Sequence, residues 1–465
     1  MSTPVPQAAA PLPQPLTVAG ELRRPGRRRS LRLDRDRAQL LAAAGRVGAV
    51  WLPAFAFSSS SSSSITEAFL GSALLTVAWM LGLRGAFTAA RSTFLAIGVI
   101  ISSAVGSLIG LVIATALSAW LPLIDLSAGD LLQATAAIFI LSVLWESLTH
   151  GSVAAEQRLL IIGADERGAE MIDQITAMQD SPFEVVGILV DDEELFPGEL
   201  ERLPAIVAHH QPDLVVMLNH RPETFDALLD VASAGFRVVG PPEFYEHAFG
   251  RVPVELVSQS WFMNVLHLYR KPYTRVAKRL FDIVVASIGL LLTAPLFPLL
   301  AWIVARTPGP VIFKQVRLGE GGVPFTIYKF RTMRQDAEAA GAVWASERDP
   351  RITRTGAFMR KTRLDELPQL WNVLHGEMSI VGPRPERPEF MAELQEAVPF
   401  WSRRHLVKPG ITGWAQVRRG YTADADGTAE KLAYDLWYLR HRSLVLDLAI
   451  CVKTFSTLFT GSGAR

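Results

Sequence analysis

Two adjacent carboxylates, Asp365 and Glu366, lie in the most informative stretch of this chain, residues 360–369, and residues 379–385 follow shortly after. Five cations accompany the pair: Arg360, Lys361, Arg363, Arg384 and Arg387. Cations neutralise phosphate oxygens, one carboxylate can attack phosphorus or act as a base, and the other can help to hold a divalent metal. The pattern indicates chemistry on phosphate esters, although an Asp-Glu pair alone is more typical of an exposed, salt-bridged helix start.

Four motifs surround this pair in a fixed order: 329–333 (KFRTM), 364–369 (LDELPQ), 381–385 (VGPRP) and 408–416 (KPGITGWAQ). Together they resemble the bacterial sugar transferases, the polyprenyl-phosphate glycosyl-1-phosphate transferases that begin surface-polysaccharide assembly. The resemblance covers residues 272–458. The layout of the whole chain also resembles the large members of that family, which have N-terminal membrane helices and a middle Rossmann-like domain.

The resemblance implies roles for individual residues. Asp365 takes the place of the family's nucleophile and Glu366 that of its partner. The basic residues needed near the substrate correspond here to Lys329, Arg360 and Arg384. We predict three further substrate-binding residues from the same region: Arg331, Arg387 and Gln369. Arg363 departs from the family pattern, because many members have a small residue such as serine there.

These residues and the resemblance predict a phosphotransferase that uses a UDP-sugar and polyprenyl (undecaprenyl) phosphate. Asp365 would attack the sugar-bearing β-phosphorus with loss of UMP, and the polyprenyl phosphate would then attack the phosphosugar-aspartate. Mg²⁺, held by Glu366 and Asp365, would offset the repulsion between the anions. The product would begin exopolysaccharide, capsule or O-antigen synthesis, and no residue identifies the sugar.

Two other functions stay open at this point. A membrane-anchored nucleotide-sugar-modifying enzyme would need an intact glycine fingerprint and a Tyr-x-x-x-Lys pair, and residues 157–245 contain neither. A non-catalytic scaffold of a polysaccharide assembly complex is the third hypothesis. We expect contact with membrane lipid and no nucleic-acid partner, and leave a homodimer open.

Composition indicates a membrane protein with several folded units. The chain has 465 residues, of which 49% are hydrophobic and only 20% charged, and its mean hydropathy is +0.24. Four apolar segments near 39–57, 66–83, 93–119 and 129–148 approach the length that spans a bilayer. A buried soluble helical bundle is the alternative. The single cysteine, Cys451, excludes an internal disulfide.

Charges in the loops predict the orientation of these helices. The N-terminal arm holds eight arginines between residues 23 and 37, and the second loop holds Arg84 and Arg91. The third loop holds Asp125 and Asp130 and no cation. By the positive-inside rule, the arm and everything after residue 149 face the cytoplasm. We therefore predict a multi-pass protein of the bacterial inner membrane with its catalytic domain on the cytoplasmic face.

The sequence predicts four regions: 1–36, a disordered basic arm; 37–150, four transmembrane helices; 151–265, a Rossmann-like α/β domain; and 266–465, an α/β monotopic catalytic domain. Strands are expected at 158–162, 185–190, 214–218 and 237–239. The turn at 163–168 lacks the middle glycine of G-x-G-x-x-G. A structural or regulatory middle domain is therefore favoured over a working nucleotide site.

A fifth apolar stretch, 283–305, is expected to enter and leave the membrane on one side, as a re-entrant helix hairpin near 280–306. Pro295 and Pro298 interrupt it, and basic residues flank both ends. The resemblance also implies a helix–break–helix, although Ala294 stands where members often have serine. A plain fifth span is the alternative.

The elements around the site are also predictable. A strand, a glycine turn and a second strand over 313–333 would place Lys329 and Arg331 on one face. Asp365 and Glu366 would open a helix, and its dipole would lower their pKa values. Residues 410–413 either shape a nucleotide pocket or form a structural turn. The basic run 403–408 is expected at lipid headgroups.

Overall fold

The computed structural model describes residues 35–460 except 62–63, 91–94, 121–126, 154–156, 164–165, 179–180, 190–199, 220, 267–271, 338–340, 342–348 and 419–424. The predicted disorder of the basic arm, 1–36, lies almost wholly outside the described residues. Two compact units emerge: one is built on Ser152–Phe244, and the other on Leu41–Gly151 together with Tyr245–Arg465.

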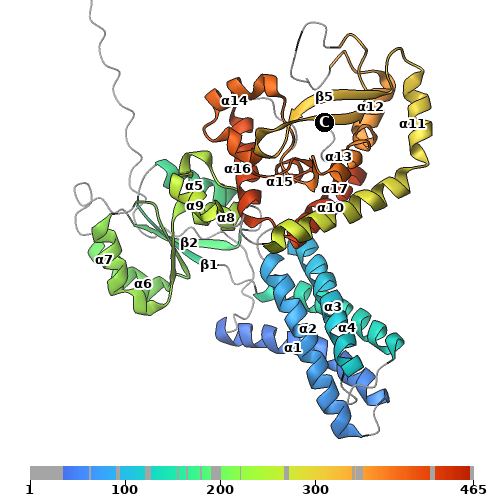
Figure 1. Ribbon diagram of the computed structural model, residues 1–465. Helices are drawn as coiled ribbons and strands as arrows, with labels where there is room; N and C mark the ends of the chain where they lie inside the picture. The colour runs from blue at the N-terminus through green and yellow to red at the C-terminus, as the bar shows by residue number, and fades with distance from the viewer. Residues whose placement is uncertain are drawn as a thin grey trace, which may run out of the picture. The chain divides into compact units, whose positions relative to one another are not determined.

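Four helices form at the four predicted apolar segments: α1 (Arg35–Ser61), α2 (Ile65–Ala90), α3 (Leu95–Trp120) and α4 (Ala128–Val153) (Figure 1). Three of them contain a segment long and apolar enough to cross a bilayer: Leu41–Ser59, Val99–Ala119 and Ala128–Thr149. The apolar part of α2, Ile65–Leu81, is shorter. Among the described residues, about three to four apolar helices therefore lie in the N-terminal region, and the count of exactly four transmembrane helices stays a prediction.

Small residues let two of these helices pack closely. A Cβ atom on Gly106 of α3 would lie 2.7 Å from the Leu83 Cα of α2, and one on Gly110 would lie 2.2 Å from the Trp79 ring. Small residues at such contacts are typical of membrane helices. The charge that Arg46 brings into α1 is matched by an ion pair with the buried Glu146 of α4.

The middle unit is a parallel α/β sheet, as predicted. Its strands are β1 (Gln157–Ile162), β2 (Phe183–Leu189), β3 (Leu214–Met217) and β4 (Arg237–Val239), in the order β2-β1-β3-β4. Its helices are α5 (Glu166–Ala177), α6 (Leu203–His210), α7 (Pro222–Asp230) and the start of α8 (Pro241–Phe249). Gly163 follows β1 with φ +107°, and a Cβ there would lie 3.0 Å from the Leu218 Cβ. Backbone conformation and packing alone therefore require this glycine.

The second unit holds every predicted chemical motif. Its part after residue 245 has the helices α9 (Gln259–Leu266), α10 (Pro272–Thr293), α11 (Leu296–Ala305), α12 (Arg354–Lys361), α13 (Gln369–His375), α14 (Met391–Ala397), α15 (Trp414–Arg418), α16 (Ala425–His441) and α17 (Leu444–Thr460). Strands β5 (Ile312–Leu318) and β6 (Pro324–Phe330) form an antiparallel hairpin, which confirms the predicted strand–turn–strand. Strands β7 (Ser379–Val381) and β8 (Gly410–Thr412) pair in parallel.

The predicted helix break at the prolines is present. Helices α10 and α11 meet at an angle of 66° across Ala294 and Pro295. Proline lacks the N–H that a continuous helix would use. Leu291 and Leu292 of α10 are 76% and 73% exposed and Trp302 of α11 is 57% exposed, so the bend presents apolar side chains outward on both arms.

The core of the catalytic unit extends upstream of the predicted boundary at residue 266. Val252, Val254, Val257 and Trp261 belong to the same buried cluster as the central Trp437 of α16. The Trp261 Nε1 donates to Glu246 Oε1 at 2.8 Å, and the Trp437 Nε1 donates to the Glu246 backbone oxygen at 3.0 Å. Residues 245–266 are therefore part of the wall of this core.

This packing predicts different behaviour for two fragments that contain all the chemical motifs. Residues 245–465 should unfold cooperatively in detergent, whereas residues 266–465 should lose several kcal/mol, because each buried large apolar side chain contributes about 1.5–3 kcal/mol. Thermal unfolding followed by tryptophan fluorescence compares the two. Equal melting temperatures would show that the upstream segment does not stabilise the core.

Candidate active site

Asp365 and Glu366 lie on a single 3₁₀ turn, Leu364–Glu366, between α12 and α13. The prediction that they open an α-helix is wrong, and Pro368 supplies the reason. An α-helix beginning at Leu364 would need the N–H of residue 368 to bond the Leu364 carbonyl, and proline has none. Leu367 N–H bonds that carbonyl instead, at 3.4 Å, and α13 begins only at Gln369. Arg363, with φ +54°, turns the chain into this segment.

Glu366 is buried among cations. Its Oε1 accepts from Arg384 Nη2 at 3.2 Å and from Lys329 Nζ at 3.5 Å, and its Oε2 lies 3.6 Å from Arg363 Nη1. Burial alone would raise the pKa of this carboxyl, but the charges of Arg384, Lys329 and Arg363 outweigh it and lower the pKa. Glu366 Oε2 accepts no hydrogen bond from any described residue.

Asp365 has a different environment from its neighbour. It is only 8% exposed, and within the described part of the chain no group donates a hydrogen bond to it. Burial, followed by the charge of Glu366, raises its pKa. The expectation of a lowered pKa at a helix start is therefore wrong for this residue, because the dominant influences are burial and a like charge. The two neighbouring carboxyls thus differ in their surroundings, because cations contact Glu366 and no described group donates a hydrogen bond to Asp365.

Lys329 reaches Glu366 from strand β6, and buried Asn372 of α13 fixes that strand. The Asn372 side chain accepts from the Tyr328 N–H at 3.2 Å and donates to the Thr326 carbonyl at 2.7 Å. It thereby bonds the free edge of β6 as a neighbouring strand would. Burial lowers the pKa of Lys329 to about 8, against the opposing effect of Glu366.

Arg384 is brought to Glu366 by close packing of three glycines. A Cβ atom on Gly382 would lie 2.3 Å from the Lys408 carbonyl oxygen, one on Gly410 would lie 2.1 Å from Gly382 N, and one on Gly413 would lie 2.2 Å from Gly382 O. No other residue fits at such distances. Residues 410–412 form strand β8 rather than the predicted turn, and packing against Gly382 accounts for Gly410 and Gly413; a nucleotide pocket there stays a prediction.

Comparisons with known proteins identify the family of this chain. The sequence model of the family described as "Bacterial sugar transferase" matches residues 273–461. A UDP-glucose:undecaprenyl-phosphate glucose-1-phosphate transferase of Klebsiella pneumoniae is 33% identical over 328 residues, which cover 66% of this chain and 68% of that protein. The chain belongs to the bacterial sugar transferase family. It is thus an enzyme, which removes the scaffold hypothesis.

Two further relatives of this sugar transferase differ in length and in name. The UDP-N-acetylgalactosamine-undecaprenyl-phosphate N-acetylgalactosaminephosphotransferase of Aeromonas hydrophila is 45% identical over 217 residues, 46% of this chain. That match spans about half of the Aeromonas protein, 51%. An exopolysaccharide production protein PSS of Rhizobium leguminosarum is 42% identical over 196 residues, covering 40% of this chain and 98% of its own length.

The remaining predicted site residues lie in varied places. Arg360, in the last turn of α12, is half-buried, and its charge acts to lower the pKa of Asp365. Gln369 is 2% exposed, and its Nε2 has no partner among the described residues. Arg387 lies beside Glu389 and over the Phe390 ring. The structure thus gathers Lys329 and Arg384 at Glu366 and leaves the substrate contacts of the others as predictions.

Arg331 lies apart from this group. Strand β6 ends at Phe330, so the alternation that would pair Arg331 with Lys329 stops before it. Its guanidinium donates to backbone carbonyls at the end of α11 and just beyond: to Val304 at 3.1 Å, Thr307 at 2.8 Å and Pro308 at 2.5 Å. This arrangement closes the end of the bent helix pair. Its contact with substrate stays a prediction.

A buried ion network, which was not predicted from the sequence, joins Arg404 to Asp435 and to Glu386, which lies close to Arg384 in the chain. Arg404 was expected at lipid headgroups, yet its side chain is 3% exposed. Its two terminal nitrogens contact Glu386 Oε1 at 2.9 Å and Asp435 Oδ2 at 2.7 Å. The lipid assignment of Arg404 is therefore wrong. The Arg404 guanidinium lies over the ring of Trp401. This nearby tryptophan is the only feature of the sequence that suggests burial of Arg404.

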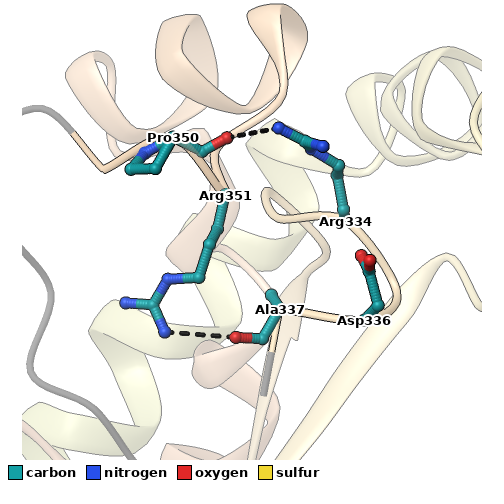
Figure 2. A pocket seen from close by; sticks show the side chains of 5 residues that line it. All are labelled: Arg334, Asp336, Ala337, Pro350 and Arg351. Atoms are coloured by element: carbon teal, nitrogen blue, oxygen red, sulfur yellow. Dashed lines mark hydrogen bonds between the residues drawn. The ribbon is translucent and has the colours of Figure 1, made fainter. Parts of the chain in front are cut away.

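A small pocket lies near the segment between β6 and α12, and no predicted site residue lines it. Figure 2 shows its lining: Arg334, Asp336, Ala337, Pro350 and Arg351. The Arg334 guanidinium donates to the Pro350 carbonyl at 2.7 Å and that of Arg351 to the Ala337 carbonyl at 3.2 Å. The two arginines therefore connect the segment 334–337 to residues 350–351.

The role of Asn372 predicts a sensitive position. Asn372→Leu keeps the branched shape and the number of side-chain heavy atoms but leaves the Tyr328 N–H and the Thr326 carbonyl without this partner, at a cost of about 1–3 kcal/mol for each buried group. We expect a lower melting temperature and a loss of turnover, because Lys329 loses its fixed position. His375→Ala, at the exposed end of the same helix, is the control. Equal effects of the two variants would contradict the role of Asn372.

Proposed function

We propose that this enzyme transfers a sugar-1-phosphate from a UDP-sugar to undecaprenyl phosphate, releasing UMP and beginning the synthesis of a surface polysaccharide. The observation that carries the proposal is the buried pair in which Glu366 is neutralised by Lys329 and Arg384 while Asp365 accepts no hydrogen bond from the described residues. The names of the relatives support the same substrates: those of the Klebsiella and Aeromonas proteins both state a UDP-sugar and undecaprenyl phosphate.

In the proposed mechanism Asp365 is the nucleophile. One of its carboxylate oxygens forms a bond to the β-phosphorus of the UDP-sugar, and the bond from that phosphorus to UMP breaks. A phosphate oxygen of undecaprenyl phosphate then attacks the same phosphorus, and the bond to Asp365 breaks. No proton has to move in either step. The raised pKa of Asp365, caused by burial and by Glu366, strengthens the attack.

The cations select and hold the anionic groups. Arg384 and Lys329 reach Glu366 from two separate elements, and in the proposed mechanism they contact the phosphate oxygens of the group that Asp365 attacks. Fixed cations in a buried site stabilise the charge that develops on phosphate oxygens without any rearrangement during the reaction. Glu366 keeps them charged and in place before the substrate binds.

The same residues fit the Mg²⁺ that we propose as cofactor. Mg²⁺ in phosphate-transfer sites is held by one or two carboxylates together with water and substrate oxygens. Glu366 Oε2, buried and without a hydrogen bond from the described residues, and Asp365 are the carboxylates that would hold it. When bound, the metal would neutralise the pyrophosphate oxygens and orient them for attack.

We also propose that the bent pair α10–α11 enters the inner membrane from the cytoplasm and returns. The 66° bend and the apolar exposed side chains of both arms support it. Cysteines placed at the exposed Arg275 and Lys314, in a Cys451→Ser background, should label from the same side in inside-out vesicles. Labelling from opposite sides would establish a fifth span instead.

The covalent step predicts a specific stoichiometry. Enzyme and UDP-sugar without the lipid acceptor should release about one UMP per active site and leave a phosphosugar on Asp365, detectable by mass spectrometry. Asp365→Asn should abolish both, because a neutral amide is a poor nucleophile, while Glu366→Gln should slow the release. The relatives differ in the sugar they are named for, so UDP-glucose and UDP-N-acetylgalactosamine are tested in parallel.

Adding the acceptor, undecaprenyl phosphate, distinguishes a covalent mechanism from direct transfer between the two substrates. With undecaprenyl phosphate present, UMP release should continue over many turnovers. If release requires the acceptor from the start, the two substrates react directly and the covalent route is excluded. If no UDP-sugar yields UMP under either condition, the proposed function itself fails.

A further inference from the structure

The first half of α10 carries three charged side chains, between residues 278 and 282, that contact other parts of the catalytic unit. Lys278 and Arg279 resemble the basic flank that commonly precedes a membrane segment. Their polar atoms are instead bonded to protein groups, as is the carboxylate of Asp282, one turn further on. Figure 1 shows α10, in yellow, running alongside α13 and α17.

Arg279 caps the helix that follows the carboxylate pair. Its Nη1 donates to the Val373 carbonyl and its Nη2 to the Leu374 carbonyl, both at 2.7 Å. These carbonyls belong to the last turn of α13, where unbonded oxygens and the negative end of the helix dipole favour a cation. The guanidinium therefore fixes the C-terminal end of the element whose other end begins three residues after Glu366.

Lys278 and Asp282 hold the strand that leads to Arg384. Lys278 Nζ donates to the Val381 carbonyl at 3.0 Å and lies 2.6 Å from Asp447 Oδ2. Asp282 Oδ1 accepts from Ser379 Oγ at 2.9 Å and from the Ile380 N–H at 3.0 Å. Thus every residue of β7 is tied to α10, and Arg384 follows three residues later.

From this geometry we infer that Lys278, Arg279 and Asp282 are positioning residues that set the spacing between Glu366 and Arg384. The α10 helix thereby joins the apolar hairpin to both halves of the site. The inference rests on the proposed function for its kinetic consequence. Its structural part, the joint restraint of α13 and β7, stands on the contacts alone.

Arg275, one turn earlier on the same helix, provides a matched control. It is exposed and makes no hydrogen bond or ion pair with the described residues. If the basic residues of α10 served to contact anionic lipid, Arg275 and Arg279 would be equivalent. If Arg279 positions the site, only Arg279 matters for turnover.

The test compares Arg279→Ala, Arg279→Lys and Arg275→Ala in the full-length protein, reconstituted in vesicles that contain anionic lipid. Turnover with UDP-sugar and undecaprenyl phosphate, vesicle flotation, and hydrogen exchange of the α13 and β7 amides are measured. We expect Arg279→Ala to lower kcat at least tenfold, to speed exchange at the end of α13, and to float as the parent does. Arg275→Ala should stay within twofold of the parent in all three.

Arg279→Lys keeps the test decisive where the alanine variant does not fold. Lysine retains the charge and most of the stem but cannot bond two carbonyls with one planar fork. Reduced kcat with faster α13 exchange supports the positioning role. Parental kcat and exchange in this variant, or equal losses in Arg275→Ala and Arg279→Ala through weaker flotation, overturn it. Because hydrogen exchange needs no turnover, it remains informative if no UDP-sugar proves to be a substrate.

Discussion

The catalytic unit depends on the burial of two neighbouring negative charges. Asp365 and Glu366 are adjacent in the chain and both are nearly buried, an arrangement that is unfavourable unless cations are supplied. Lys329 and Arg384 supply them at Glu366. Because these cations come from strand β6 and from the loop after β7, the two elements must be held against the turn that carries the carboxylates.

Three different local features position the charges of the site. Asn372 replaces a missing neighbouring strand and so fixes β6. Gly382, Gly410 and Gly413 allow two backbones to approach more closely than any side chain would permit. Pro368 blocks an early start of α13 and leaves the carboxylates on a tight turn. None of these residues needs to touch a substrate, yet each sets where a charge lies.

The sequence predicts what local patterns determine. Continuous apolar runs predicted the strands of the middle unit, a glycine turn between two strands predicted the hairpin at 313–333, and Pro295 predicted the helix break. Four ordered motifs indicated the family. The start of α13 at Gln369 departs from the prediction because Pro368 has no N–H to bond the Leu364 carbonyl. Arg331 and Arg404 could not be placed, because an isolated arginine in a sequence does not reveal whether carbonyls or carboxylates surround it in the fold.

The burial of Arg404 also explains why the charges near Arg384 do not simply repel one another. Arg404 is bonded to Glu386 and Asp435, so its charge is balanced before it acts on the site. Burial raises the pKa of Asp435 to about 6, with Arg404 opposing and Glu386 adding to the rise. Removing Arg404 would leave the buried Asp435 and the half-buried Glu386 without this ion pair, and removing one partner of a buried pair typically costs about 3–5 kcal/mol. Lys329 and Arg384 thus share one carboxylate, Glu366, whereas Arg404 alone faces two, Glu386 and Asp435. Relative to its carboxylates, positive charge is therefore greater beside Asp365 and Glu366 than around Arg404.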